Sequence, residues 1–144
     1  MSTKLQQMAE AADSPHAAQR ASFLSLKYMK EKNKAAWVAL FAEEGLLQDP
    51  VGPSPLDPSG QGFRGKEGIG RFWDLLNSGV TSASFTVEVI ESFPCGDECA
   101  NDWFGVHTQP DGTVFKAPVI SVYRVNAAGK LLSVKGYWDT SALK

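Results

Sequence analysis

Asp49 is the residue of this sequence whose position best suits acid–base chemistry. It follows the apolar pair Leu46–Leu47 and precedes Pro50, so its carboxyl group is expected at the end of a short strand. In an apolar pocket the ionised form of a carboxyl group is disfavoured, so its pKa rises and the group can exchange protons near neutral pH. Asp49 could instead only cap the turn that follows. The spacing alone fits both interpretations.

Small residues alternate with aromatic and aliphatic ones in two strand-like segments near the C-terminus. Side chains two positions apart share a face of a strand, which groups Val119, Ser121 and Tyr123 on one strand and Val134, Gly136 and Trp138 on the next. Ser121 and Gly136 are small where a filled core favours Leu or Ile. The pattern fits a pocket for a flat apolar ligand. It also fits a core filled by aromatic side chains, which is the commoner use of such residues.

Metal binding and phosphate binding are two other chemistries that the sequence suggests, and both fit poorly. Cys95 and Cys99 precede His107 at a spacing that matches no common structural zinc site. If Phe104 faces inward, strand alternation turns His107 outward. The segment GQGFRG at 60–65 lacks the Lys-Ser/Thr of a phosphate-binding loop. We therefore expect free thiols, no metal and no cofactor.

Helices occupy the first half of the chain and strands the second half. Apolar residues recur at helical spacing from Pro15, after a Ser14 N-cap, to about Lys32, and again over 34–43 and 66–77. A short strand is expected at 46–51 and a loop over 51–65. Alternation then predicts strands at 84–93, 101–109, 113–125 and 130–139. This order indicates an α+β fold in which helices pack on one face of a curved antiparallel sheet.

Size and composition describe one ordinary domain. The chain has 144 residues, and we expect a polar extension over 1–13 followed by a single domain over 14–144. Its 14 Lys and Arg against 16 Asp and Glu give no basic surface of the kind that nucleic acid requires. No apolar run reaches the length of about 18 residues needed to span a membrane, and the start does not resemble a secretory signal. The two cysteines fit a reducing compartment, so we expect a cytoplasmic protein.

Two blocks of the sequence resemble a known family. LFAEEGLLQDPVG at 40–52 and YRVNAAGKLLSVKGYW at 123–138 are similar to the ketosteroid isomerase-like branch of the nuclear transport factor 2-like, or SnoaL-like, superfamily. The similarity extends from about Ala21 to Trp138. It implies a cone in which three helices and a strongly curved antiparallel or mixed sheet enclose an apolar pocket. It also implies a homodimer paired through the outer face of the sheet.

The resemblance assigns roles to individual positions. Asp49 matches the catalytic base, which moves a proton along a dienolate. Ser25 stands where the family has an oxyanion-binding tyrosine, and Ser121 stands where it has a protonated aspartic acid. Losing one oxyanion donor typically costs about a hundred- to a thousandfold in rate. The positions expected to line the ligand pocket are Trp73, Phe104, Val119, Tyr123, Gly136 and Trp138.

Two other residues could replace the missing donors. Tyr28 lies about one helical turn beyond Ser25, on roughly the same face. Asp102 shares the strand of Phe104 and would face inward in the same register. Tyr28 could equally be a core residue, and Asp102 a solvated strand end.

Four functions therefore compete. The first is a steroid isomerase-like enzyme that acts on a flat, steroid-like ketone, with weak activity because its donors are replaced. The second is a non-catalytic protein that binds a steroid or another small hydrophobic ligand, and the third is a polyketide cyclase-like enzyme. The fourth is an interaction module that uses the outer face of the sheet.

Overall fold

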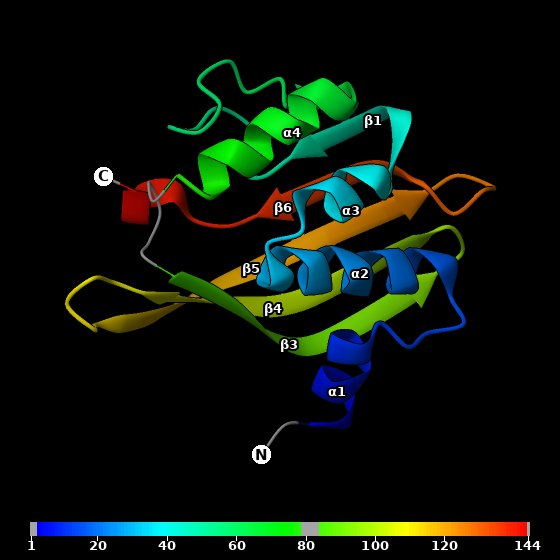
Figure 1. The fold of residues 1–144 in the computed structure, drawn as a ribbon, viewed down its shortest axis with the longest axis horizontal. Coiled ribbons are helices and arrows are strands. Elements are labelled where there is room, and N and C mark those ends of the chain that lie inside the picture. Colours follow the sequence, from blue (N-terminus) through cyan, green and yellow to red (C-terminus); the bar gives the residue numbers. More distant parts are fainter. Residues whose placement is uncertain (1–2, 79–83, 144) are drawn as a thin grey trace.

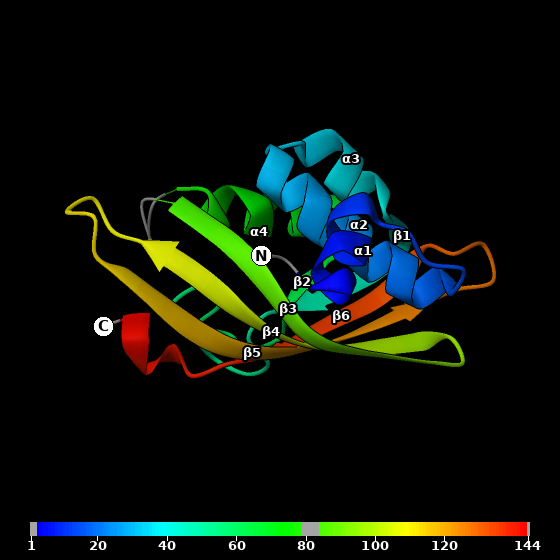
Figure 2. The same cartoon turned by 90° about the horizontal axis from the view of Figure 1, so that it is seen from below.

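A helical layer packs against one face of a long, bent sheet (Figures 1 and 2). The computed structural model describes residues 3–78 and 84–143. Its helices are α1 (Lys4–Ala11), α2 (Ala17–Glu31), α3 (Lys34–Ala39) and α4 (Gly65–Leu76), and a 3-10 turn follows at Thr140–Leu143. Its strands are β1 (Phe41–Gln48), β2 (Phe63–Arg64), β3 (Ser84–Cys95), β4 (Glu98–Thr108), β5 (Val114–Val125) and β6 (Leu131–Tyr137).

The sheet is mixed and follows the order β2-β1-β6-β5-β4-β3. β1 runs parallel to β6, and the other neighbouring strands are antiparallel. Helix α2 lies over β3, β4 and β5, α3 contacts β1, α4 lies beside β1 and β2, and α1 lies beside β3 (Figure 1). The predicted α+β cone with its antiparallel or mixed sheet is thereby confirmed.

The main core lies between α3, α4 and the inner face of the sheet. Trp37 is its centre: its ring centroid is 5.1 Å from that of Phe41 and 5.2 Å from that of Trp73. All three side chains are buried. A smaller cluster of Ala9, Phe23, Leu26 and Val89 joins α1 and α2 to β3. Apolar burial of this kind is the principal stabilisation of the fold.

Two expectations about the N-terminal half are wrong. Helical structure was expected to begin at Pro15, whereas residues 4–11 already form helix α1, which is held against β3 because the Gln6 side chain accepts a hydrogen bond from the Val89 amide (2.7 Å). Ser14 does not cap α2, whose N-cap is His16; the Ser14 hydroxyl accepts from the His16 amide and donates to Gln19 (2.7 Å).

The chain also enters the sheet earlier than expected. The predicted helix over 34–43 stops at Ala39, and β1 begins at Phe41. The Leu131 amide donates to the Leu40 carbonyl (2.8 Å), and Phe41 is paired with Leu131 of β6. Pairing with β6 therefore overrides the local helical spacing, as tertiary contacts commonly do.

Candidate functional site

Asp49 lies at the wall of an internal cavity between the helices and the sheet. The cavity has a volume of about 70 Å³. Most of the side chains around it are apolar, and the polar ones among those described are Asp49, His107 and Asp139. The residues that line it are Met29, Asp49, Leu56, Phe72, Leu76, Phe85, Trp103, Gly105, His107, Phe115, Ala117, Val119, Trp138 and Asp139. We call this space the Asp49 cavity.

The Asp49 carboxyl group is held in place by strand β6 and by Trp138, the residue that follows this strand. Asp49 comes directly after β1, and the Val51 amide continues the pairing by donating to the Gly136 carbonyl (2.9 Å). The Trp138 indole Nε1 donates to Asp49 Oδ1 (2.6 Å). A Cβ atom built on Gly136 would lie 2.8 Å from Asp49 Cγ. The carboxyl group therefore occupies the space that any larger residue at position 136 would need.

Burial makes Asp49 a weaker acid. It raises the pKa of the Asp49 carboxyl group from 3.8 to about 6, and the hydrogen bond from Trp138 opposes this rise. Desolvation dominates because the charged form loses water and gains a single neutral donor in return. A carboxyl group with this pKa can accept and return a proton near neutral pH.

Ser25 and Ser121, at the two positions where the resemblance places oxyanion donors, are both buried and both bonded to tryptophan. Trp37 Nε1 donates to Ser25 Oγ (3.0 Å), and Trp103 Nε1 donates to Ser121 Oγ (2.9 Å). Neither serine is among the described residues that line the cavity. Both lie close enough to the Tyr123 phenol to lower its pKa as hydrogen-bond donors, although burial and the Asp49 charge raise that pKa overall.

The predicted register of β4 is wrong by one residue. Trp103 faces the cavity and pairs with Val119, whereas Phe104 lies on the outer face beneath the Lys116 ammonium group (5.7 Å). Asp102 shares that outer face, so it is not a donor inside the pocket. Two adjacent aromatic residues make the alternation ambiguous. The buried Asn101 fixes the register, since its Nδ2 donates to Ser22 of α2 (2.9 Å). Asn101 therefore faces the helices, and so does Trp103, two residues further along β4.

The same correction brings His107 into the cavity. Its ring stacks on Phe115 with centroids 4.8 Å apart and lies 5.1 Å from the ring of Phe85. Burial lowers the pKa of His107, which favours the neutral imidazole. His107 was predicted to face outward, and Asp139 was not among the predicted site residues. Strand alternation would have placed His107 correctly once Trp103 was taken as the inward residue.

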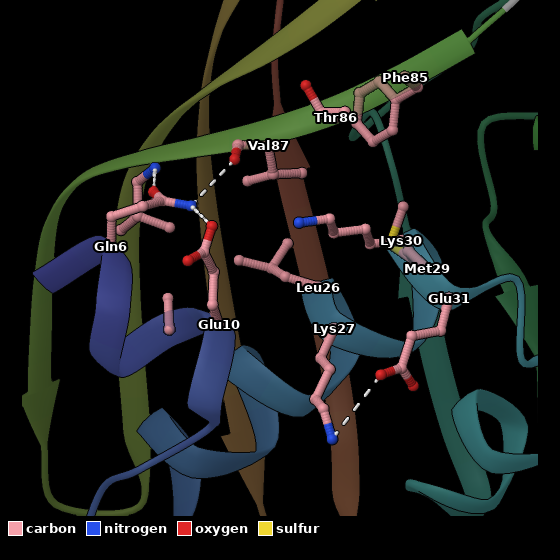
Figure 3. A pocket seen from close by; sticks show the side chains of 12 residues that line it. Gln6, Glu10, Leu26, Lys27, Met29, Lys30, Glu31, Phe85, Thr86 and Val87 are labelled. Carbon is pink, nitrogen blue, oxygen red and sulfur yellow. Dashed lines mark hydrogen bonds and ion pairs between the residues drawn. The ribbon is translucent and has the colours of Figure 1, made fainter. Parts of the chain in front are cut away.

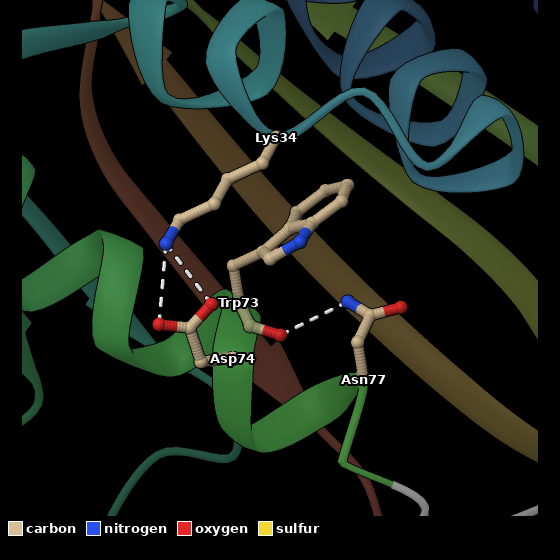
Figure 4. Close-up of polar contacts among 4 residues, drawn as sticks. All are labelled: Lys34, Trp73, Asp74 and Asn77. Atoms are coloured by element: carbon tan, nitrogen blue, oxygen red, sulfur yellow. Dashed lines mark hydrogen bonds and ion pairs between the residues drawn. The ribbon is translucent and has the colours of Figure 1, made fainter.

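Trp73, a predicted pocket residue, and Tyr28, a possible replacement donor, belong to the core rather than to the cavity. Trp73 packs against Trp37, and near it Lys34 Nζ bonds Asp74 Oδ1 (2.9 Å) while Asn77 Nδ2 bonds the Trp73 carbonyl (2.9 Å; Figure 4). Tyr28 is half-buried against the main core. Neither is among the described residues that line the cavity. Of the predicted pocket residues, Val119 and Trp138 line it, and Gly136 lies behind Asp49.

A second and larger hollow lies outside the Asp49 cavity. It has a volume of about 530 Å³ and is bordered by α1, α2 and β3 (Figure 3). Several of its side chains are charged, including Glu10, Lys27 and Lys30. Met29 and Phe85 border both this outer groove and the Asp49 cavity. These two side chains therefore separate the outer groove from the buried carboxyl group.

Two further features of the described part of the chain bear on function. Over residues 3–78 and 84–143, no three His, Cys, Asp or Glu side chains come together as metal ligands, and both cysteines are free. None of the helices in these ranges has the length and apolar character to cross a membrane.

An α+β cone with a carboxyl group buried at an apolar cavity defines the class of protein. Residues 25–134 match the model of the SnoaL-like domain, and the chain belongs to this family. No curated protein matches the chain in a sequence search.

Solved structures extend the comparison to proteins with steroid ligands. RV0760c from Mycobacterium tuberculosis in complex with estradiol-17beta-hemisuccinate is 31% identical, with a TM-score of 0.75 over 86% of this chain and 95% of that one. Delta 5-3-ketosteroid isomerase from Mycobacterium sp. is 28% identical, with a TM-score of 0.72 over 88% and 96%. A computationally designed 17-OHP binder is 30% identical, with a TM-score of 0.72 over 86% and 92%.

Proposed function

We propose that the protein binds a flat, steroid-like ketone in the Asp49 cavity and slowly isomerises it. The observation that carries this proposal is the Asp49 carboxyl group, buried at the wall of an apolar cavity with its pKa raised to about 6. The similarity to a ketosteroid isomerase and to a steroid complex supports the ligand class.

The proposed reaction is a proton shuttle. The Asp49 carboxylate removes a proton from the carbon between the ketone and an isolated double bond, and the electron pair moves to the carbonyl oxygen to give a dienolate. The Asp49 carboxylic acid then returns the same proton to the far end of the dienolate. The double bond is now conjugated with the ketone, and Asp49 is again ionised. Nothing is oxidised or reduced, and no cofactor takes part.

The cavity must widen to hold such a ligand. Ligand pockets typically enclose roughly 300–1,000 Å³, whereas the Asp49 cavity has about 70 Å³. Met29 and Phe85, which separate it from the outer groove, are the side chains whose movement would join the two spaces. Met is unbranched and adapts readily to new packing. We propose that the ligand enters between these two residues.

Ligand binding can be tested by titrating an α,β-unsaturated 3-ketosteroid and following tryptophan fluorescence, since Trp103 and Trp138 line the cavity. Val119→Phe fills the cavity and is expected to abolish the saturable change. Val114→Phe is the matched control, because Val114 is the first residue of β5, is 56% exposed and does not line the cavity. Equal binding by the wild type and Val119→Phe would place the ligand elsewhere.

Binding without turnover is the second candidate. It is favoured by the serines at positions 25 and 121, which already accept hydrogen bonds from indoles. A β,γ-unsaturated 3-ketosteroid separates the candidates: a binding protein leaves it unchanged, whereas an isomerase converts it to the conjugated ketone in a reaction that needs Asp49.

We also propose that the outer face of the sheet pairs with a second copy of the chain. Several apolar side chains on this face are strongly exposed, among them Phe93 (59%), Ile120 (43%) and Tyr137 (47%). Ile120 and Tyr137 are direct cross-strand partners and so form one continuous patch. Sedimentation of the wild type and of Ile120→Glu tests this, with a dimer expected only for the wild type. A wild-type monomer would refute it.

A further inference from the structure

The sheet contributes one polar side chain to the described lining of the Asp49 cavity. Of the lining residues that β4 and β5 supply, His107 is polar and the others are apolar. Tyr123, which was expected to line the pocket, is buried in the main core and is not among the described lining residues. Asp139 lines the cavity beyond the end of β6, but it is exposed, and its Oδ1 accepts from the Ser141 amide (2.9 Å). His107 is therefore the polar group of the cavity floor whose role the proton shuttle leaves unexplained.

Aromatic neighbours on both sides hold the His107 ring. Its direct cross-strand partners are Phe85 of β3 and Phe115 of β5. Phe115 stacks on the imidazole, with ring centroids 4.8 Å apart and an angle of 9° between the planes. The Phe85 centroid lies 5.1 Å from that of the imidazole. These contacts fix the plane of the ring and leave its edge to face the cavity.

The Nε2 atom of His107 is directed along the cavity floor. Gly105 lies two residues before His107, on the same face of β4. A Cβ atom built on Gly105 would lie 3.1 Å from His107 Nε2. The imidazole therefore leans back over Gly105 and uses space that a side chain at position 105 would need. This relationship repeats that between Gly136 and Asp49 at the other end of the floor.

Strand pairing gives the separation of the two polar groups. Gly136, beneath the buried carboxyl group, pairs with Ser121 of β5. Gly105, beneath the imidazole, pairs with Ala117 of the same strand. Ser121 and Ala117 are four residues apart, which is about 13 Å at the usual rise of a strand. A flat four-ring skeleton has a length of this order, so its two ends would lie near the carboxyl group and near the imidazole.

The entry route favours the same orientation of the ligand. Phe85 borders both the outer groove and the Asp49 cavity, and it is the direct partner of His107. A ketone that enters past Phe85 with its carbonyl end first reaches Asp49. Its trailing end then stays beside the imidazole.

We propose that His107 Nε2 forms a hydrogen bond with a hydroxyl group at the end of the ligand remote from the ketone, and that the protein thereby selects flat ketones that carry this group. The inference rests on the proposed function and adds a specificity-determining residue to its site. A hydroxyl group both donates and accepts, so it matches Nε2 whether that atom carries the ring proton or a lone pair. A ligand without the hydroxyl group places an apolar carbon against Nε2 and cannot form this bond.

The charge state of the imidazole agrees with an uncharged partner. Burial lowers the pKa of His107, which favours the neutral ring. A neutral imidazole offers no positive charge to a carboxylate or a phosphate group. A hydroxyl group, which brings no charge into the apolar cavity, is therefore the better match.

A pair of ligands and a set of variants test the inference together. The ligands are two α,β-unsaturated 3-ketosteroids that differ in one hydroxyl group, on the ring farthest from the ketone. The ratio of their dissociation constants is measured by tryptophan fluorescence for the wild type, His107→Phe and His107→Gln. We expect the wild type to bind the hydroxylated steroid about three- to tenfold more tightly, the range of one neutral hydrogen bond. His107→Phe should lose this preference, and His107→Gln, which keeps a donor and an acceptor, should retain part of it.

His16→Phe is the matched control. His16 is the N-cap residue of α2, is exposed and is not among the described lining residues. The ratio of dissociation constants in His16→Phe should equal that of the wild type.

The outcomes separate this inference from the function on which it rests. If the wild type binds neither steroid, the proposed function fails and the assignment falls with it. If both steroids bind and the ratio is the same in the wild type and His107→Phe, the proposed function stands and the assignment to His107 is overturned. A histidine that serves packing alone gives this second result, because its loss weakens both steroids equally.

A measurement on the wild type covers the case in which the His107 variants do not fold. The chain has two histidines, His16 and His107, whose rings are labelled with nitrogen-15. Hydrogen bonding changes the chemical shift of an imidazole nitrogen. We therefore expect different Nε2 shifts of His107 in the complexes with the two steroids, and the same shifts of His16. Equal Nε2 shifts of His107 in both complexes would also overturn the assignment.

Discussion

The Asp49 carboxyl group lies directly over the Cα atom of Gly136, at a distance that leaves no room for a side chain on Gly136. Position 136 faces the interior, opposite Ser121 on β5, where a filled core would carry a larger residue. The space that glycine leaves is filled by the carboxyl group, which Trp138 then fixes from two residues further along the chain. The C-terminal end of β6 and the residue after it thus provide both the space for Asp49 and its hydrogen-bond donor.

Gly136→Ala should therefore displace Asp49. A Cβ at this position would lie 2.8 Å from Asp49 Cγ, so either the carboxyl group or the strand must move. We expect a loss of about 1–3 kcal/mol in the free energy of unfolding, as for other overpacked sites, and loss of any Asp49-dependent turnover. Urea denaturation and the isomerisation assay measure the two effects.

Gly70→Ala is the matched control for this substitution. Gly70 lies inside α4, and a Cβ there would meet the Lys34 side chain at an ordinary 3.6 Å. Replacing a helical glycine by alanine should stabilise the protein by about 0.5–1 kcal/mol. If Gly136→Ala behaved like Gly70→Ala, the placement of Asp49 would be wrong.

The activity should depend on pH through Asp49. The base form predominates above the pKa of about 6, so kcat/KM should rise as pH increases through 6 and then level off. Below this range it should fall about tenfold per pH unit. A rate that is constant between pH 4.5 and 7.5 would exclude Asp49 as the base.

Asp49→Asn should stabilise the fold at neutral pH. The folded-state pKa is raised from 3.8 to about 6, so the folded chain binds more protons than the unfolded chain between these values and loses stability as pH rises through them. The cost is fully present above about pH 6, where it amounts to about 2–3 kcal/mol, and is absent below pH 3.8. Chemical denaturation at pH 7.5 and at pH 4 should show a stabilisation by Asp49→Asn that shrinks at the lower pH. Equal stabilities of the variant and the wild type at pH 7.5 would show that Asp49 is well solvated.

Trp138→Phe should raise the pKa of Asp49 further. It removes the 2.6 Å indole hydrogen bond, which opposes the effect of burial. The carboxyl titration, followed by carbon-13 NMR of labelled aspartate, should move to higher pH than in the wild type. Trp73→Phe is the control, because Trp73 is a core residue with no hydrogen bond to Asp49 among the described contacts. An unmoved titration in Trp138→Phe would show that the indole does not stabilise the carboxylate.

The sequence predicted the elements of the fold better than the faces of its strands. Periodicity placed α2, α4 and strands β3 to β6, because each has a long apolar repeat. It missed α1, although Leu5, Met8, Ala9 and Ala12 recur at helical spacing, because two of these four residues are alanines in a short polar segment. It also extended α3 into β1, since the pairing of Phe41 with Leu131 joins residues far apart in the sequence.

The candidate site was predicted only in part, because local sequence reveals some of its residues and contacts between distant elements determine the rest. Asp49 and Gly136 were singled out from local sequence, and they lie in contact. The register of β4 was wrong because Trp103 and Phe104 are adjacent and equally apolar. The buried contact between Asn101 and Ser22, which fixes the register, joins two elements and leaves no local signal. The indole partners of Ser25 and Ser121 are likewise visible only after folding.

The most direct test of the account is the fate of a deuterium label during isomerisation. A β,γ-unsaturated 3-ketosteroid carrying deuterium on the carbon between the ketone and the double bond is incubated with the wild type, Asp49→Asn and Asp102→Asn, whose carboxyl group lies on the outer face. We predict slow formation of the conjugated ketone by the wild type and Asp102→Asn, with label recovered at the far carbon. Asp49→Asn should be slower by a hundredfold or more, as expected for loss of a general base, which contributes about 10²–10⁴ in rate. Equal rates for the wild type and Asp49→Asn would contradict the central claim that Asp49 carries the proton.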